Sequence, residues 1–156
     1  MHMLLTNHVL TGIFLGLSID EEVVLFPTAV ASHLAMDMVP HFGFPQGSNN
    51  HGFRSRPFLI VGSLDFLASI VVLGAFCIAL PQRSGHMIIG AFGAALPDLT
   101  YIPEIIFGKR IYHFVPWLER LIYGFLGPIQ RYESPLGTVV EVLWALLMLH
   151  VLGVIA

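Results

Sequence analysis

The sequence predicts an all-α protein, a polytopic bundle of about five transmembrane helices with one further helix lying in the membrane interface. Hydrophobic residues make up 56% of the chain, charged residues only 11%, and the mean hydropathy is +0.80. A soluble domain carries roughly 25% charged residues, so the surface of a soluble protein of this size would lack polar cover. The 156 residues fit one domain, 1–156, and the net charge of -3 indicates no nucleic-acid partner.

Each predicted span is an apolar stretch approaching the roughly 20 residues that a helix needs to cross a bilayer. The five stretches cover residues 4–19, 23–39, 58–80, 86–107 and 136–156. The first two are short and are joined by the acidic turn Asp20-Glu21-Glu22, which predicts a helical hairpin. Residues 40–57 are rich in Gly, Pro, Ser and Asn and predict a loop. Residues 108–135 place apolar side chains at helical spacing beside polar ones, which predicts the interfacial helix.

The positive charges predict the orientation of the chain. With five spans, six of the seven basic residues fall in loops on one side: Arg54, Arg56, Lys109, Arg110, Arg120 and Arg131. Arg83 falls on the other side. Because cytoplasmic loops carry the excess of Lys and Arg, we expect a cytoplasmic N-terminus and an external C-terminus.

Small residues are spaced for close helix contact in two of the spans. Gly12 and Gly16, and likewise Gly90 and Ala94, lie four residues apart. This spacing lets two helix backbones approach closely, and it predicts tight packing of these segments.

The most informative polar pattern is the run SHLAMDMVPH inside the second span. It places His33, Asp37 and His41 at positions i, i+4 and i+8, on one face of a helix. Imidazoles and a carboxylate aligned in this way are suitable metal ligands, and they are costly to place in lipid without a partner. The alternatives are a hydrogen-bonded His33–Asp37 pair that stabilises the bundle, and a solvated loop histidine at position 41.

Further ionisable groups fall in the same half of the predicted bundle. His8 lies near the start of the first span, Asp65 lies about two turns into the third, Asp98 follows Pro97 in the fourth, and Glu141 lies just inside the fifth. His86 and His150 fall near the opposite face. A shared depth predicts one pocket that opens to the cytoplasmic leaflet.

We therefore predict that His8, His33, Asp37 and Asp98 hold a divalent metal, for which zinc is the best candidate. Three residues are predicted as catalytic: Asp65 and Glu141, as a general base or as groups that orient the imidazoles, and His41, as a proton donor or further ligand. Structural pairing across helices is the alternative for the two carboxylates.

Four basic residues beside the predicted pocket have two interpretations. They set the topology, or they form a rim that binds the phosphate of a substrate. They are Arg54, Arg56, Lys109 and Arg110.

The motifs around His8, Ser32-His33-x3-Asp37-x2-Pro40-His41 and Pro97-Asp98 resemble those of small bacterial membrane-bound metal-dependent hydrolases. The His-x3-Asp-x3-His run is also similar to part of the zinc-dependent phospholipase C and P1 nuclease pattern. The resemblance implies a divalent metal held by His8, His33, Asp37 and Asp98, and hydrolysis of a phosphoester or lipid-like bond. It also implies the bacterial inner membrane as the location.

The leading functional hypothesis is a membrane-embedded metal-dependent hydrolase that acts on a lipid or phosphorylated amphiphile. A transport protein that moves protons or metal ions is the alternative from another class, and a non-catalytic membrane scaffold is the third. The oligomeric state is not predicted.

Overall fold

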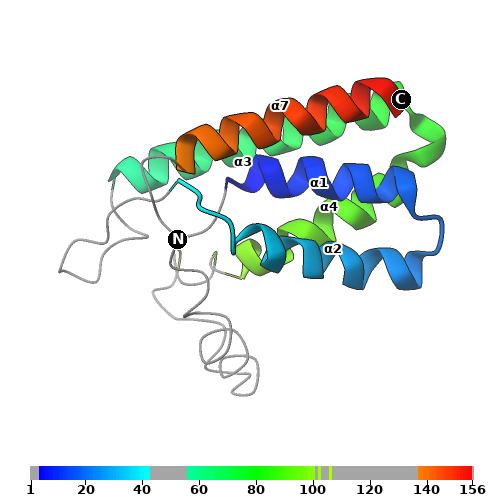
Figure 1. Ribbon diagram of the computed structural model, residues 1–156, viewed down its shortest axis with the longest axis horizontal. Helices are drawn as coiled ribbons and strands as arrows, with labels where there is room; N and C mark the ends of the chain where they lie inside the picture. The colour runs from blue at the N-terminus through cyan, green and yellow to red at the C-terminus, as the bar shows by residue number, and fades with distance from the viewer. Residues whose placement is uncertain (1–3, 43–55, 101, 103–105, 107–136, 156) are drawn as a thin grey trace, which may run out of the picture.

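The computed structural model describes residues 4–42, 56–100, 102, 106 and 137–155. Their helices pack side by side with their axes roughly aligned, some parallel and some antiparallel (Figure 1). The helices are α1 (Leu5–Ser18), α2 (Glu22–Met36), α3 (Arg56–Ala79), α4 (Ser84–Leu99) and α7 (Gly137–Ile155), with a 3-10 turn, η2 (Pro81–Arg83), between α3 and α4. These residues contain no strand, so the predicted all-α fold class is confirmed.

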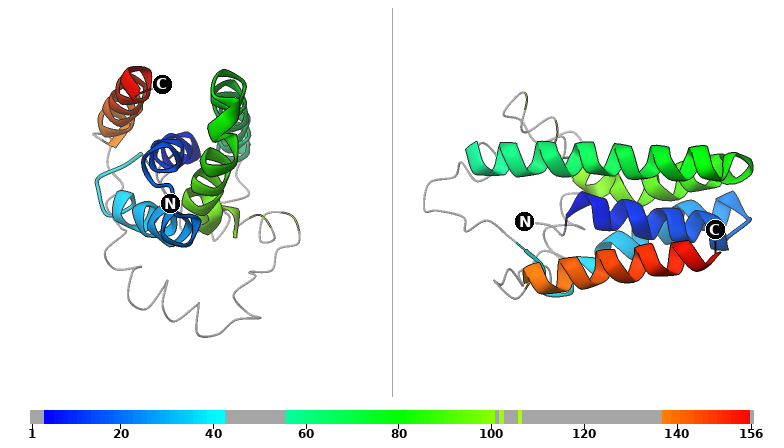
Figure 2. Two further views of the ribbon diagram at one scale, coloured as in Figure 1. Left: turned by 90° about the vertical axis from the view of Figure 1, so that its right-hand side faces the viewer. Right: turned by 90° about the horizontal axis from the view of Figure 1, so that it is seen from above.

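Helix α1 lies at the centre of the described bundle. It contacts α2, α3, α4 and α7, which surround it when the bundle is seen end-on (Figure 2, left). The apolar core is built mainly from α1, α4 and α7, and its members are Val9, Leu10, Ile13, Met87, Ala91, Ala95, Met148 and Leu152. The central place of α1 explains why its own side chains are almost all buried or half-buried.

Helices α1 and α4 run antiparallel with their backbones in contact, as the spacing of small residues predicts. A Cβ atom added to Gly12 would lie 2.6 Å from the Cα of Ala91, and one added to Gly16 would lie 2.8 Å from the Cα of Met87. Because no side chain larger than hydrogen fits at these two positions, they determine the distance between α1 and α4. The same antiparallel register brings His8, one turn before Gly12, to the C-terminal end of α4.

Two of the described helices are long and apolar enough to cross a membrane: α3 over Phe58–Ala79, and α7. Only 6% of the apolar stretch in α3 and 17% of that in α7 is buried within the protein, in contrast to the core helix of a soluble protein. Their exposed side chains are large and apolar, including Leu64, Ile70, Leu143 and Leu146. This exposed apolar surface is suited to contact with lipid tails.

The prediction of five spans is not confirmed. Helices α1, α2 and α4 have 14, 15 and 16 residues. At 1.5 Å per residue they measure about 21–24 Å, shorter than the hydrocarbon core of about 30 Å. Helix α4 also ends at Leu99 rather than near residue 107, and Pro97 in its last turn removes a backbone donor there.

The predicted hairpin of α1 and α2 is present, and its turn is tied to the start of α4. The Arg83 guanidinium donates to the Asp20 carboxylate, and His86 Nε2 lies 2.9 Å from the Asp20 carbonyl oxygen. The predicted loop 40–57 is described only at residues 40–42 and 56–57, and the predicted interfacial helix 108–135 lies outside the described residues.

Candidate metal centre

The four predicted metal ligands meet at one end of the bundle, contributed by three helices. His8 lies in the second turn of α1, His33 in the last turn of α2, Asp37 at the C-cap of α2, and Asp98 in the last turn of α4. Since α2 and α4 both run antiparallel to α1, their C-terminal ends lie beside its N-terminal end (Figure 1). The structure thus brings these four residues together at one end of the described bundle.

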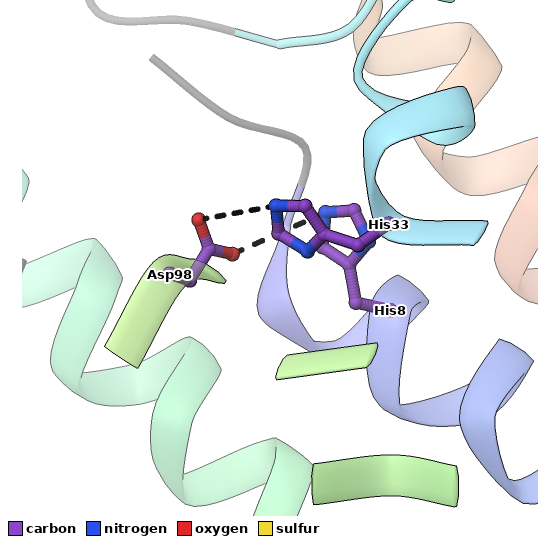
Figure 3. A group of neighbouring side chains, drawn as sticks. All are labelled: His8, His33 and Asp98. Atoms are coloured by element: carbon purple, nitrogen blue, oxygen red, sulfur yellow. Dashed lines mark ion pairs between the residues drawn. The ribbon is translucent and has the colours of Figure 1, made fainter. Parts of the chain in front are cut away.

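The two imidazole rings are stacked, and both carboxylates face their Nε2 atoms. The ring centroids of His8 and His33 are 3.9 Å apart with an angle of 23° between the planes. Asp98 directs Oδ2 at His8 Nε2 (4.0 Å) and Oδ1 at His33 Nε2 (3.9 Å), as Figure 3 shows. Asp37 bridges the same pair, with Oδ1 3.3 Å from His8 Nε2 and Oδ2 3.2 Å from His33 Nε2.

These separations are those expected of ligand atoms around one ion. Zn–N and Zn–O bonds of about 2.0–2.2 Å in a tetrahedral site place neighbouring ligand atoms about 3.3–3.6 Å apart. The Asp37 separations of 3.3 and 3.2 Å lie at the lower edge of that interval, and the Asp98 separations of 4.0 and 3.9 Å lie above it. His8, His33 and Asp98 each offer one ligand atom, and these atoms lie within 4.8 Å of one another. The group of His8, His33 and Asp98 therefore fits a divalent ion with small inward shifts of Asp98, and Asp37 lies outside this group although it contacts both imidazoles.

A backbone contact determines which nitrogen of His33 carries a proton. His33 Nδ1 lies 2.7 Å from the carbonyl oxygen of Ala94. A carbonyl oxygen only accepts, so Nδ1 must donate, and in the neutral ring Nε2 then holds a lone pair. That lone pair faces the oxygens of Asp37 and Asp98, which are acceptors too when ionised. A cation between these groups, either a metal ion or an added proton, would satisfy the imidazole and both carboxylates.

The four side chains of the site differ in their exposure. His8, His33 and Asp37 are completely buried, whereas the side chain of Asp98 is 17% exposed. His8 Nδ1 is also buried and has no hydrogen-bond partner among the described residues. Water or a substrate therefore has access past Asp98, at the C-terminal end of α4.

Asp65 and Glu141, predicted as catalytic, lie at the same end of the bundle but contact the backbone of α1. Asp65 accepts from the amides of Leu5 (2.6 Å) and Thr6 (3.1 Å). Glu141 accepts from the amide of Leu4 (3.0 Å). Neither carboxylate belongs to the cluster of His8, His33 and Asp98. Their catalytic role stays a prediction, but the contacts favour a role in positioning.

His41 is completely buried, so it is not the solvated loop histidine considered as an alternative. Its Nδ1 lies 2.8 Å from the carbonyl oxygen of Val39, and its imidazole lies near the Glu141 carboxylate. It is also outside the three-residue metal cluster. A proton-donor role for His41 stays a prediction.

Asn7 is a buried polar residue that the sequence-based prediction did not include. Its side-chain amide donates to the Glu141 carboxylate and to the Glu141 carbonyl oxygen (3.1 Å). Its position directly before His8, in the first turn of an otherwise apolar helix, is the signal that would have identified it.

The basic residues predicted to bind substrate fall mostly outside the described residues. Arg56 begins α3 at the end of the bundle that holds the metal cluster, and it is exposed. Arg54, Lys109 and Arg110 lie outside the described part of the chain. Their role as a phosphate-binding rim stays a prediction.

No protein-family model, curated protein or solved structure matches this chain. The resemblance to the membrane-bound hydrolases therefore rests on the short motifs around His8, His33 and Asp98. The chemistry open to the protein follows from the arrangement of its buried histidines and carboxylates.

Proposed function

We propose that this protein is a membrane-embedded, metal-dependent hydrolase whose site takes a divalent ion, zinc being the best match. The observation that carries the proposal is the hydrogen bond from His33 Nδ1 to the Ala94 carbonyl oxygen, which directs the Nε2 lone pair at two carboxylates. A metal-ligating histidine typically donates its other ring N–H to a backbone carbonyl in this way.

Charge balance favours a metal ion over a single proton. Two carboxylates, Asp37 and Asp98, face the two buried imidazoles. Buried carboxylates are costly without compensation, and a divalent cation compensates both at once. His8, His33, Asp37 and Asp98 would hold the ion.

A divalent ion bound there would supply a Lewis acid and lower the pKa of water so that it attacks near neutral pH. Asp37, which contacts both Nε2 atoms, would hold the ion together with the two imidazoles. The partly exposed Asp98 carboxylate lies at the side of the site that water and substrate would enter. Complete burial of both histidines excludes bulk water from the remaining sides.

The place of the site in the bundle supports a lipid or phosphoester substrate. The site lies at one end of a bundle whose outer helices, α3 and α7, expose apolar side chains suited to lipid tails. A pocket at that depth meets lipid head groups, and the exposed Arg56 at the start of α3 is available to a phosphate. From the charge bias of the loops we expect this end to face the cytoplasm, and the resemblance of the motifs implies a bacterial inner membrane.

Transport is the alternative function, and the described core offers no polar path to support it. Beyond the site, α1, α4 and α7 meet through Ile13, Met87 and Leu152, all apolar and fully buried. The opposite end carries the exposed groups Asp20 and His150. A carrier of protons or metal ions would need ionisable groups between the two ends.

The proposal is tested by elemental analysis, which measures the metal bound to the detergent-purified wild type and to His33→Ala. We expect about one zinc per chain in the wild type, loss of metal in His33→Ala, and metal-dependent cleavage of a phospholipid or an aryl phosphodiester. The control is His150→Ala, which removes an exposed histidine from the opposite end.

Three results would contradict the hydrolase. A wild-type protein that takes up no metal after divalent ions are added back rules out the site. Proton or metal flux in liposomes without hydrolysis favours transport. Loss of stability in His33→Ala with neither metal nor flux in the wild type favours the scaffold.

A further inference from the structure

The N-terminal end of α1 is held by carboxylates from two other helices. The first amides of a helix have no partner inside the helix, and a side chain at the N-cap usually accepts from one of them. The N-cap of α1 is Leu4, which has no such side chain. Asp65 of α3 and Glu141 of α7 accept from these amides in its place.

The contacts of Asp65 fix the first turn of α1 against α3. Its two oxygens accept separately from the amides of Leu5 and Thr6, and Oδ1 also accepts from the Thr6 hydroxyl (2.5 Å). Ser69, one turn further along α3, lies 3.2 Å from the same hydroxyl. Two backbone contacts and one side-chain contact to a single carboxylate leave little freedom for the helix to slide or rotate.

Glu141 fixes the opposite side of the same turn. It accepts from the Leu4 amide through Oε1 and from the Asn7 side chain through Oε2. Asn7 directly precedes His8, so this contact sets the rotation of α1 at the residue before the proposed ligand. Glu141 is 3% exposed, and a carboxylate at this depth next to a helix N-terminus interacts favourably with the helix dipole.

We infer that Asp65 and Glu141 form a carboxylate clamp on α1 that positions the metal ligand His8, acting through the helix backbone rather than on the substrate. The inference rests on the proposed metal site. It assigns both residues as positioning residues, because their oxygens contact the amides of residues 4–6 and the Asn7 side chain. His8 needs external positioning because its own Nδ1 has no hydrogen-bond partner among the described residues.

Zinc titration of Asp65→Asn and Glu141→Gln, in the full chain in detergent, tests the clamp. Each amide keeps the size of the side chain but replaces one acceptor with a donor facing the α1 amides. We expect zinc affinity to fall about 10–100-fold with stoichiometry unchanged at saturating zinc, as for other residues behind a metal ligand. The visible spectrum of the Co²⁺ form should change as well. Asp20→Asn, an exposed carboxylate at the far end, should match the wild type.

A second variant separates positioning from simple stabilisation of the helix. Adding Leu4→Ser to Asp65→Asn supplies a local N-cap, so it should recover the melting temperature while zinc affinity stays low. Recovery of both together, or unchanged affinity in Asp65→Asn and Glu141→Gln, would overturn the inference.

NMR of the metal-free protein distinguishes failure of the proposed metal site from failure of the carboxylate clamp. If the wild type binds no zinc, the proposed function fails, but the His8 ring resonances still report its position. These resonances are identified by their loss in His8→Gln. A changed His8 signal in Asp65→Asn but not in Asp20→Asn supports the clamp, and an unchanged signal refutes it.

Discussion

Replacing Gly12 with alanine tests whether backbone contact between α1 and α4 sets the geometry of the candidate metal centre. The new Cβ would lie 2.6 Å from both the Cα of Ala91 and the carbonyl carbon of Gly90. All the atoms it meets belong to the backbone of α4, so no side-chain rotation relieves the overlap. The two helices must move apart.

The size of the effect follows from ordinary contact distances. Carbon atoms pack at about 3.5–4.0 Å, so α1 and α4 must separate by about 1 Å. Overpacking of this kind costs about 1–3 kcal/mol of unfolding free energy. His8 lies one turn from Gly12, and its 4.0 Å separation from Asp98 would grow to about 5 Å. That separation is too large for two ligands of one ion, so we expect zinc affinity to fall on the order of 10-fold or more.

The assay combines thermal unfolding in detergent, followed by circular dichroism, with zinc titration of the same samples. Gly74→Ala on α3 is the matched control, because nothing lies within 4 Å of its added Cβ. That variant should be neutral or stabilised by up to about 1 kcal/mol through helix propensity. The reasoning is refuted if Gly12→Ala unfolds and binds zinc like Gly74→Ala.

Three further predictions concern the polar groups. Asp37→Asn should abolish most zinc binding while keeping the helical content, because it removes a buried charge that faces both imidazoles. If the variant binds zinc with wild-type affinity in a zinc titration, Asp37 is excluded as a ligand. Thr11→Val should lower the unfolding free energy by about 1 kcal/mol in thermal melts, because Trp144 Nε1 loses its acceptor at 3.0 Å. The Arg83 guanidinium holds the pKa of Asp20 below its usual value, so this pair stabilises the fold above about pH 4 and loses that contribution as the pH falls through the lowered pKa. Melting temperatures of wild type and Arg83→Gln should therefore converge in acid, and a constant difference would contradict the ion pair.

The membrane character of the protein and the identity of the proposed ligands were predictable from local sequence properties. Hydropathy depends on composition alone, and the spacing of His33 and Asp37 places both on one helix face whatever surrounds them. The close packing of Gly12 against α4 was also predictable, because the four-residue spacing of small residues has one main structural use. By contrast, the prediction of five membrane-spanning helices is not confirmed, because three of the predicted segments form shorter helices that end at Ser18, Met36 and Leu99.

The tertiary structure decided which carboxylates face the histidines and which hold the backbone. Asp65 and Glu141 lie on α3 and α7, helices so uniformly apolar that no sequence pattern marks the face turned toward α1. Their rotation about their own axes is set by packing against α1, and that rotation directs both carboxylates to the amides of the first turn. The tautomer of His33 likewise depends on the Ala94 carbonyl of another helix. Sequence alone therefore indicated most of the polar residues that gather at this end of the bundle, and only the packing of the described helices determined which of them are buried and what each of them contacts.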